Sequence, residues 1–164
     1  MKPIFKNLLF ALTISCLLFS CSKDNSAPAV KDYPKADMKV EVSFKGDLSS
    51  QLVFASVAGI SVKNANDHVG TSIKLLNDQT NESDIIWNLK NAQFEDHDKY
   101  TFSSVGKVTK AMIEVAFNED RPAGLAEDKQ IAITVKIYFD GKLADEQTFS
   151  NDKAHAESYT INVE

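Results

Sequence analysis

Apolar residues recur at every second position in one segment after another from Met38 onward, and this alternation constrains the fold more than any other feature. The longest regular run consists of Ile131, Ile133, Val135, Ile137 and Phe139. A period of two is typical of a β-strand with one buried face, whereas an amphipathic helix needs apolar residues every three to four positions. No comparable run has the helical spacing, so the sequence predicts an all-β domain.

Six further segments share the alternation, and we expect the apolar positions of each to form the buried face of a strand. They are Val40, Val42 and Phe44; Leu52, Phe54, Ala58, Ile60 and Val62; Ile85, Trp87 and Leu89; Tyr100 and Phe102; Ala111, Ile113, Val115 and Phe117; and Tyr159, Ile161 and Val163. Gly59 lies within the longest of these segments, where a glycine predicts a β-bulge or a bend.

The pair Asp140-Gly141 predicts a tight turn directly after the clearest strand. A type I′ turn needs positive φ at both central residues, which Asp-Gly tolerates well. We therefore expect a β-hairpin whose second strand runs over residues 142–150. The segment 121–129 contains Pro122 and Gly124 and is expected to be a loop with one helical turn at most.

Seven to nine such strands, separated by frequent turn signals, predict an antiparallel, immunoglobulin-like β-sandwich without its disulfide. A closed barrel is the alternative. Two patches, residues 137–144 and 156–161, resemble the final hairpin and strand of small secreted sandwich domains.

The first twenty residues have the composition of a secretory signal peptide. Lys2 and Lys6 precede an apolar stretch from Leu8 to Phe19, and no acidic residue occurs there. The stretch is about a dozen residues long, whereas a helix that crosses a bilayer needs roughly twenty. The sequence therefore favours a cleaved leader over a permanent transmembrane helix.

The end of the leader and the first residue after it, Leu18-Phe19-Ser20-Cys21, resemble the lipobox of bacterial lipoproteins. This resemblance implies cleavage before Cys21 and attachment of a lipid to its thiol. The alternative is an ordinary signal peptide followed by a chance cysteine. Cys16 lies within the leader, so Cys21 would be the lone cysteine of the mature chain and no intramolecular disulfide could form.

A polar segment rich in Ser, Lys, Asp, Asn, Ala and Pro follows the cysteine and is expected to be a flexible tether. The predicted organisation is therefore a signal peptide at 1–20, a lipidated cysteine and tether at 21–37, and a β-sandwich at 38–164. The start of the tether, residues 21–25, is similar to the short export signals of Bacteroidota lipoproteins. It implies an outer-membrane location, on the periplasmic or the cell-surface face.

The chain is acidic, with 18 basic and 23 acidic residues. Removal of Lys2 and Lys6 would leave 16 basic residues against 23 acidic ones, a net charge of about −7. Nucleic acids and anionic lipid surfaces bind concentrated Lys and Arg, and Arg121 is the single arginine of this chain. We expect no nucleic-acid partner, and membrane contact through the lipid alone.

Two acidic segments are candidate metal sites, and we expect neither to bind a metal or any other cofactor. Glu95-Asp96-His97-Asp98 places neighbouring side chains on opposite faces if the segment is extended, so at most two could meet at one ion. The loop from Asn77 to Asp84 lacks the glycine and glutamate spacing of an EF-hand. Both are expected to be solvated turns.

The sequence also predicts that the protein is not an enzyme. His68, His97 and His155 lie in polar stretches, no Gly-x-Ser-x-Gly motif occurs, and the free cysteine is assigned to lipid. Trp87 alternates in phase with apolar neighbours and is expected in the core rather than in a sugar site. Tyr138 is out of phase with its neighbours and is expected on the outside, in a binding surface or a cross-strand pair.

These features predict a non-catalytic binding or structural module, tethered through Cys21 to the outer membrane, that contacts a protein or glycan partner. The alternative is a small envelope enzyme or enzyme inhibitor. A deep pocket that combines His68 or His97 with carboxylates would favour chemistry, whereas a flat exposed face would favour binding.

Overall fold

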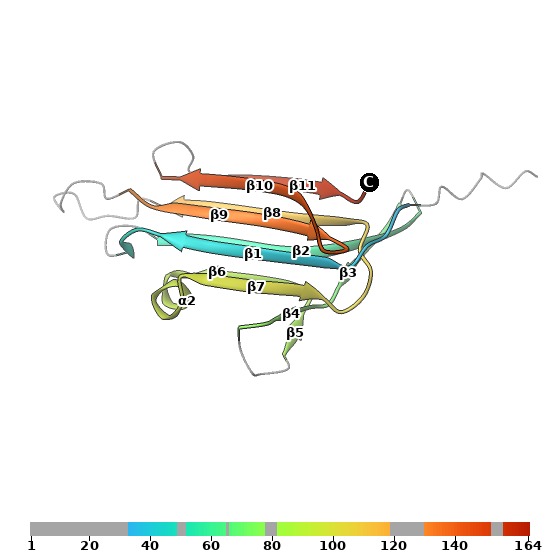
Figure 1. Ribbon diagram of the computed structural model, residues 1–164, viewed down its shortest axis with the longest axis horizontal. Helices are drawn as coiled ribbons and strands as arrows, with labels where there is room; N and C mark the ends of the chain where they lie inside the picture. The colour runs from blue at the N-terminus through green and yellow to red at the C-terminus, as the bar shows by residue number, and fades with distance from the viewer. Residues whose placement is uncertain (1–32, 49–51, 65, 78–81, 119–129, 152–155) are drawn as a thin grey trace, which may run out of the picture. The chain divides into compact units, whose positions relative to one another are not determined.

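The structure, a computed structural model, describes residues 33–48, 52–64, 66–77, 82–118, 130–151 and 156–164. All of them belong to one compact unit, Asp32–Glu164. Their strands form two antiparallel β-sheets that lie one behind the other (Figure 1). No helix in this part of the chain is long and apolar enough to cross a membrane. The predicted leader, Cys21 and most of the predicted tether lie outside the described residues.

The larger sheet has six strands in the order β10-β9-β1-β7-β4-β5. Their bounds are β10 Lys142–Ser150, β9 Ala132–Phe139, β1 Met38–Lys45, β7 Lys99–Ser104, β4 Ile73–Leu75 and β5 Ser83–Asp84.

The smaller sheet has five strands, in which β11, β8, β2 and β3 follow one another and β6 also pairs with β2. Their bounds are β11 Ala156–Asn162, β8 Lys110–Asn118, β2 Leu52–Asn64, β3 Asp67–Thr71 and β6 Ile86–Lys90. The long β2 pairs with β8 along one edge. Along its other edge, residues 54–58 pair with β6 and residues 59–64 with β3.

The hydrophobic core lies between the two sheets. Its most deeply buried large side chains are Met38, Ile73, Leu89, Phe102, Ile113, Ile131, Ile133 and Ile137. Strand β9 alternates strictly between buried and half-buried residues, as its sequence predicts. The all-β class and the two-sheet sandwich are thus confirmed, while the immunoglobulin-like connectivity stays a prediction.

The described part of the chain contains eleven strands, so the predicted count of seven to nine is too low. The additional strands β3, β4 and β5 have five, three and two residues, and a strand this short shows no readable alternation. One short helix was also missed: α2 covers Asn91–Asp96 and is anchored by the buried ring of Phe94. The predicted loop at 121–129 lies outside the described residues.

The hairpin between β9 and β10 is confirmed. Asp140 and Gly141 adopt φ values of 49° and 78°, the positive values that a type I′ turn requires. The two strands pair from Phe139 and Lys142 onward, with a register shift between Leu143 and Asp145.

The predicted burial of β2 is wrong for Leu52 and Phe54, whereas Ala58 and Val62 are buried as predicted. Val53, Ala55 and Val57 are buried and point into the core, so the alternate residues Leu52 and Phe54 point outward. The cause is that β2 carries apolar residues on both faces, and alternation alone cannot then decide which face is inside. Gly59, expected at a bulge or a bend, pairs with β8 in an unbroken register instead. It faces the core, where a Cβ would come within 2.9 Å of a methyl carbon of Val108.

Candidate functional site

The outer face of the six-stranded sheet is polar, and we call it the polar face. Residues that point outward there include Lys39, Glu41, Ser43, Lys99, Thr101, Ser103, Thr134, Lys136, Tyr138, Glu146 and Thr148. Most of the charged residues in this set form ion pairs with one another. A polar outer face is common in an antiparallel sheet, because one side of the sheet packs on the core and the other side contacts water.

Glu41 is the centre of the charge network on the polar face. Its carboxylate accepts hydrogen bonds from Lys99 Nζ at 2.9 Å and from Lys39 Nζ at 3.0 Å. The bond from Lys99 first, and that from Lys39 second, hold the pKa of Glu41 below its ordinary value. Lys136 pairs with Glu146 at 3.1 Å, and this hydrogen bond raises the pKa of the lysine. The charges of this face are therefore largely satisfied within the chain.

Tyr138 lies on this face, as its phase predicts, and Lys39 Nζ sits 4.1 Å from the centre of its ring. The two residues are direct cross-strand partners in the register of β1 and β9. Of the two predicted roles for Tyr138, this contact supports the cross-strand pair.

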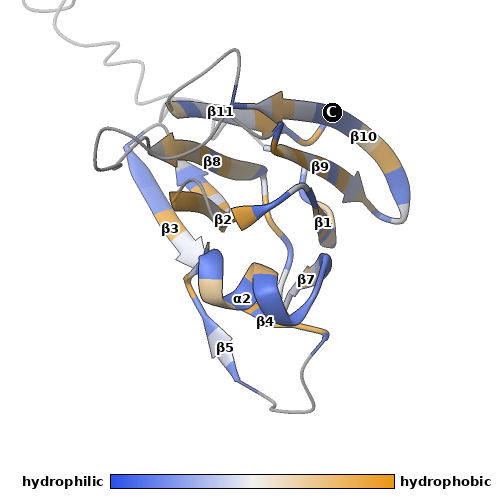
Figure 2. Ribbon diagram, turned by 90° about the vertical axis from the view of Figure 1, so that its left-hand side faces the viewer, coloured by the Kyte–Doolittle hydropathy of each residue, from blue (hydrophilic) through white to orange (hydrophobic). Residues whose placement is uncertain are grey.

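The outer face of the five-stranded sheet is different, because apolar residues lie on it on both sides of a polar row, which consists of Asn88, Ser56 and Glu114. We call this outer face the apolar face, and its apolar residues are Leu52, Phe54, Ala58, Ile60, Ile86, Met112 and Ala116. Figure 2 shows β2 and β8 of this sheet next to each other, with apolar residues along both. Leu52, Phe54 and Ile60, which the alternation of β2 places in the core, thus lie on the outer side of the sheet, while Ala58 on the same side is buried.

The register of the strands places these side chains in rows across the sheet. Ala58 of β2 lies between Ile86 of β6 and Met112 of β8, its direct partners on either side. In a second row, Phe54 lies between Lys90 and Ala116. Directly opposite residues in an antiparallel pair point to the same face, so each row is contiguous.

The apolar face is open to solvent. Leu52 is 51% exposed, Ile86 is 45% exposed and Met112 is 39% exposed. A pocket of about 350 Å³ at one end of this face is lined by Leu52, Phe54, Ala116 and the first turn of α2. Exposed apolar side chains grouped on one face of a domain are typical of a binding site.

Ile85 is a further exposed apolar residue near this face. It was expected inside with Trp87 and Leu89, yet it is 51% exposed and precedes β6. Its side chain occupies the space in which a Cβ on Gly70 would stand. The chain bends at Ile85, between β5 and β6, so this side chain does not share the buried face of β6. Alternation in the sequence does not reveal such a bend.

Trp87 and Leu89 do point inward. Leu89 is buried, and Trp87 is half-buried against the core, with its ring 6.2 Å from that of Phe102. The prediction of a core role for Trp87 is therefore confirmed.

The acidic segment at 95–98 does not form a cluster of metal ligands. Glu95 and Asp96 belong to α2 and His97 caps its end, so a short helix stands where a solvated turn was expected. The His97 ring packs edge-on against Tyr100. Among the described residues, no three His, Cys, Asp or Glu side chains come close enough together to hold one ion.

The other acidic segment, 77–84, is described only at its ends. Asn77 uses its side-chain amide to bind β7: its Nδ2 donates to the Lys99 carbonyl and its Oδ1 accepts from the Thr101 amide, both at 2.6 Å. Residues 78–81 lie outside the described part of the chain, and Ser83 and Asp84 form β5.

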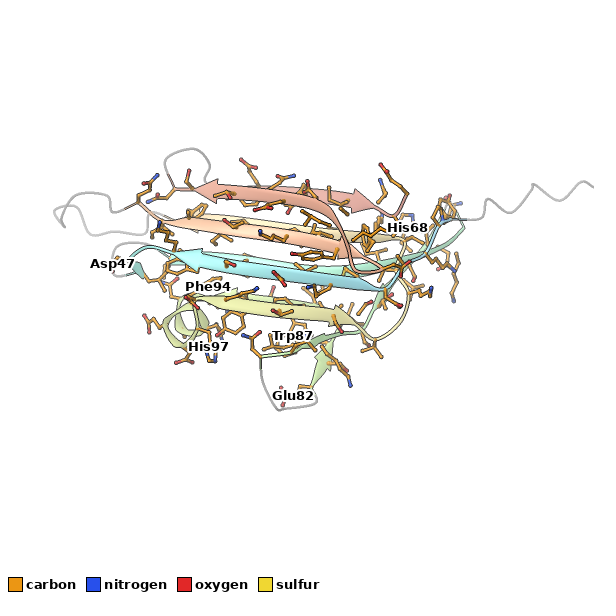
Figure 3. The ribbon with its side chains drawn as sticks, viewed as in Figure 1. Asp47, His68, Glu82, Trp87, Phe94 and His97 are labelled. Atoms are coloured by element: carbon orange, nitrogen blue, oxygen red, sulfur yellow. The ribbon has the colours of Figure 1, made fainter. Side chains whose placement is uncertain are left out.

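The two described histidines lie at opposite ends of the domain (Figure 3). His68 Nδ1 is 3.3 Å from Lys110 Nζ, on the five-stranded sheet, and His97 lies beyond α2. His155 is outside the described residues. The arrangement does not bring His68 and His97 into one site.

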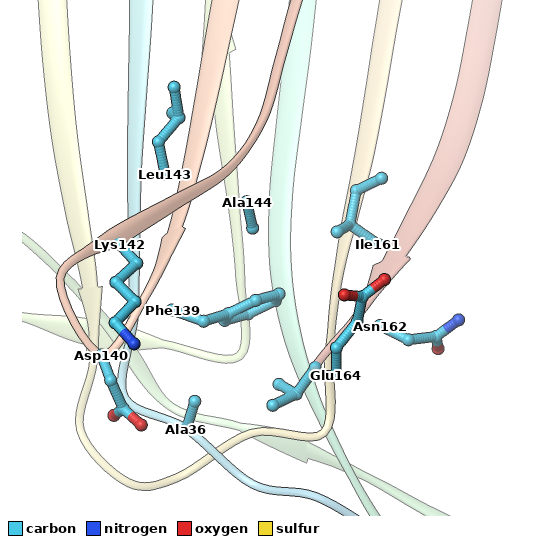
Figure 4. A pocket seen from close by; sticks show the side chains of 10 residues that line it. Ala36, Phe139, Asp140, Lys142, Leu143, Ala144, Ile161, Asn162 and Glu164 are labelled. Atoms are coloured by element: carbon cyan, nitrogen blue, oxygen red, sulfur yellow. The ribbon is translucent and has the colours of Figure 1, made fainter.

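A second pocket, of about 370 Å³, lies between the turn after β9 and the end of β11 (Figure 4). Its charged residues are Asp140, Lys142 and Glu164. Asp140 is already engaged, because its Oδ1 accepts a hydrogen bond from the Asp37 amide at 2.9 Å. No histidine lines either pocket.

Solved structures of proteins from Bacteroides and Parabacteroides share this fold. A crystal structure of a domain of unknown function, DUF4425, from Bacteroides vulgatus matches with a TM-score of 0.55 and 15% identity, over 80% of this chain and 98% of that one. The calcium-bound form of a protein from Parabacteroides distasonis, solved by NMR, matches with a TM-score of 0.56 and 20% identity, over 80% and 98%.

A DUF4425 family protein from Bacteroides ovatus has a TM-score of 0.54 and 11% identity, over 78% of this chain and 95% of that one. At these identities the likeness establishes the sandwich fold and nothing finer. No protein-family model matches the sequence, and no curated protein matches it.

Proposed function

We propose that this chain is the precursor of a lipid-anchored envelope protein whose domain binds a protein partner through the apolar face. The observation that carries the binding proposal is the contrast between the two outer faces. One sheet presents ion pairs and hydroxyl groups to water, while the other presents Leu52, Ile86 and Met112. Burial of apolar surface stabilises a complex by about 25 cal/mol per Å².

A protein partner fits this face better than a glycan. Glycan sites rely on flat aromatic rings, whereas the exposed apolar residues here are mainly aliphatic, with one aromatic ring, that of Phe54. Ser158 and Thr160 of β11 border the face. Protein interfaces combine apolar contacts with hydrogen bonds, and the row of Asn88, Ser56 and Glu114 offers polar groups between the apolar residues.

Support for a non-catalytic role comes from the geometry of the candidate chemical groups. His68 and His97 are separated, and Asp140 is held by a backbone amide. The alternative, a small envelope enzyme or enzyme inhibitor, has no comparable arrangement among the described residues to support it.

Support for the lipid anchor comes from the sequence at Cys21 and from the bacterial origin of the structures that share the fold. The proposed location is the outer membrane. The relative from Parabacteroides distasonis was solved with calcium. For this chain we propose no calcium site among the described residues, because their acidic side chains form no group of three.

A photo-activated cross-linking residue at position 112 tests the binding proposal. The full chain is produced with its leader in its own or a related bacterium, and intact cells are irradiated. We expect a defined adduct that mass spectrometry identifies as a protein. The matched control carries the same residue at Thr134 on the polar face, where we expect no adduct. Equal yields from both positions, or none from position 112, would overturn the proposal.

A further inference from the structure

We infer that the partner of the apolar face is a second copy of this chain, packed face to face about a two-fold axis that runs along β2. This inference rests on the proposed function, and it names the partner. It follows from the symmetry of the face, from the placement of its charges and from its size.

The apolar face is nearly symmetric about β2. Strands β6 and β8 lie on opposite sides of β2 at the same three register positions, those of residues 54, 56 and 58. A two-fold axis parallel to β2 exchanges these two sides. It therefore places Ile86 of one copy against Met112 of the second copy, and it does so twice.

The charges on this face complement one another across the same axis. Lys90 lies on β6 beside Phe54, and Glu114 lies on β8 beside Ser56. The two-fold operation places Lys90 of one copy opposite Ala116 of the second copy. In that second copy, Glu114 lies one row away from Ala116. That row spacing is about 7 Å along a strand, within reach of a lysine side chain. Among the described residues, neither Lys90 nor Glu114 forms a salt bridge within the chain.

Asn88 lies in the same row as Glu114, on the other side of Ser56. The axis places this amide directly opposite Glu114 of the second copy, where it can donate a hydrogen bond. The polar row thus becomes paired in the complex instead of remaining buried without partners.

The size of the face predicts a weak dimer. Strand β11 has no counterpart beyond β6, so three strand positions overlap across this axis; at about 4.8 Å spacing, over nine residues of about 3.4 Å each, they cover roughly 440 Å² per copy. The total of about 900 Å² lies below the range of stable specific interfaces and in that of weak, transient ones. A shared membrane, as proposed through Cys21, would raise the local concentration of copies and favour such an association.

Disulfide trapping in cells tests this arrangement. The full chain carrying Ile86→Cys and Met112→Cys is produced with its leader, oxidised mildly and separated on a non-reducing gel. We expect a product of twice the chain mass, because the two-fold axis brings the new thiols together between copies. Within one copy they are two strands apart, beyond disulfide reach. The control pair Thr134→Cys and Lys99→Cys has the same two-strand separation on the polar face and should give no such product.

Charge reversal then tests the symmetry itself. In the disulfide-trapping chain, Lys90→Glu alone or Glu114→Lys alone creates two like-charge contacts per dimer, and we expect the dimer yield to fall about tenfold. When the two variants are produced together with different tags, both contacts become attractive again. We expect dimers that contain both tags to recover to within about twofold of the unreversed chain.

The outcomes separate this inference from the proposed function. A different protein in the adduct at position 112, without a disulfide dimer, would overturn the second copy while leaving a protein-binding face. Charge reversals that leave the yield unchanged would overturn the two-fold arrangement. Absence of any adduct at position 112 would overturn the proposed function, and this inference with it. Circular dichroism of each purified variant verifies that the sandwich still folds.

Discussion

The indole Nε1 of Trp87 donates a hydrogen bond to the backbone carbonyl of Ile73 at 2.9 Å and thereby joins β6 of one sheet to β4 of the other. Most contacts between the sheets are apolar, and apolar contacts do not fix the relative orientation of the groups that make them. This bond fixes how the short β4 sits against the core, so it offers a direct test of the packing.

We expect Trp87→Phe to lower the free energy of unfolding by about 1–3 kcal/mol, since it removes the donor and leaves the Ile73 carbonyl without it. Urea denaturation followed by circular dichroism measures the loss. The control Tyr138→Phe removes a hydroxyl that is 3.5 Å from Glu41 on the polar face, and should change stability by less than about 0.5 kcal/mol. Equal losses in the two variants would contradict the role of the bond.

A second prediction concerns the turn at Gly141. Gly141→Val should cost about 1–2 kcal/mol, because a side chain with Cβ disfavours the positive φ of 78°. No atom lies within 4 Å of the position of a new Cβ, so the cost is conformational and involves no clash. Gly106→Val is the control: its φ is outside the left-handed region and the nearest atom is 3.8 Å away. A thermal melt that ranks Gly106→Val as the more harmful change would contradict this account.

The strands with one apolar face could be predicted from the sequence in both position and orientation. Strands β1 and β9 bury the predicted residues, because their outward positions are mainly polar and the alternation has one solution. The turn at Asp140-Gly141 was equally accessible, since few residue pairs tolerate its backbone angles.

The candidate site could not be predicted, because alternation identifies the buried face of a strand only when the other face is polar. The sequence of β2 is apolar on both faces, so periodicity cannot distinguish a core residue such as Val57 from an outer one such as Ile60. The deciding information is the pairing of β2 with β6 and β8, which joins segments far apart in the chain. The one signal of an apolar outer face in the sequence was the thirteen-residue length of β2 with apolar residues on both of its sides.

A third prediction concerns the pH dependence of stability through Glu41. Because its pKa is lowered in the folded state, Glu41 stabilises the fold above its ordinary pKa, and this contribution is lost as the pH falls through the lowered value. Glu41→Gln should therefore reduce the difference in unfolding free energy between about pH 6 and pH 3. The side chain is partly solvated, so the effect should stay within about 1 kcal/mol and shrink in 1 M salt.

The two lysines give this prediction its internal control. Lys99→Met should flatten the pH dependence more than Lys39→Met, because the hydrogen bond from Lys99 is the larger cause of the lowered pKa. The reverse order, or a pH profile of Glu41→Gln that matches the unsubstituted chain, would show that the network does not act through Glu41.

A fourth prediction addresses calcium. Glu95, Asp96 and Asp98 are exposed and belong to no group of three potential ligands in the described part of the chain. A chain with Glu95→Gln, Asp96→Asn and Asp98→Asn should therefore show the same calcium-dependent change in melting temperature as the unsubstituted chain, whatever its size. Differential scanning fluorimetry with calcium, and with magnesium for comparison, measures it. A calcium effect lost in the triple variant would place a site at this helix.

The last prediction concerns the anchor. Cys21→Ala should move the protein from the membrane fraction to the soluble fraction, because each buried CH₂ of an acyl chain contributes about 0.8 kcal/mol and stable anchoring needs two or more chains. Cys16→Ala is the matched control: it changes the other cysteine, within the proposed leader, and should leave the protein in the membrane fraction. Fractionation followed by immunoblotting separates the two results, and mass spectrometry of the N-terminal peptide detects the lipid. Retention of the Cys21→Ala protein on membranes that have been washed with high salt would mean that something other than an acylated thiol holds it there.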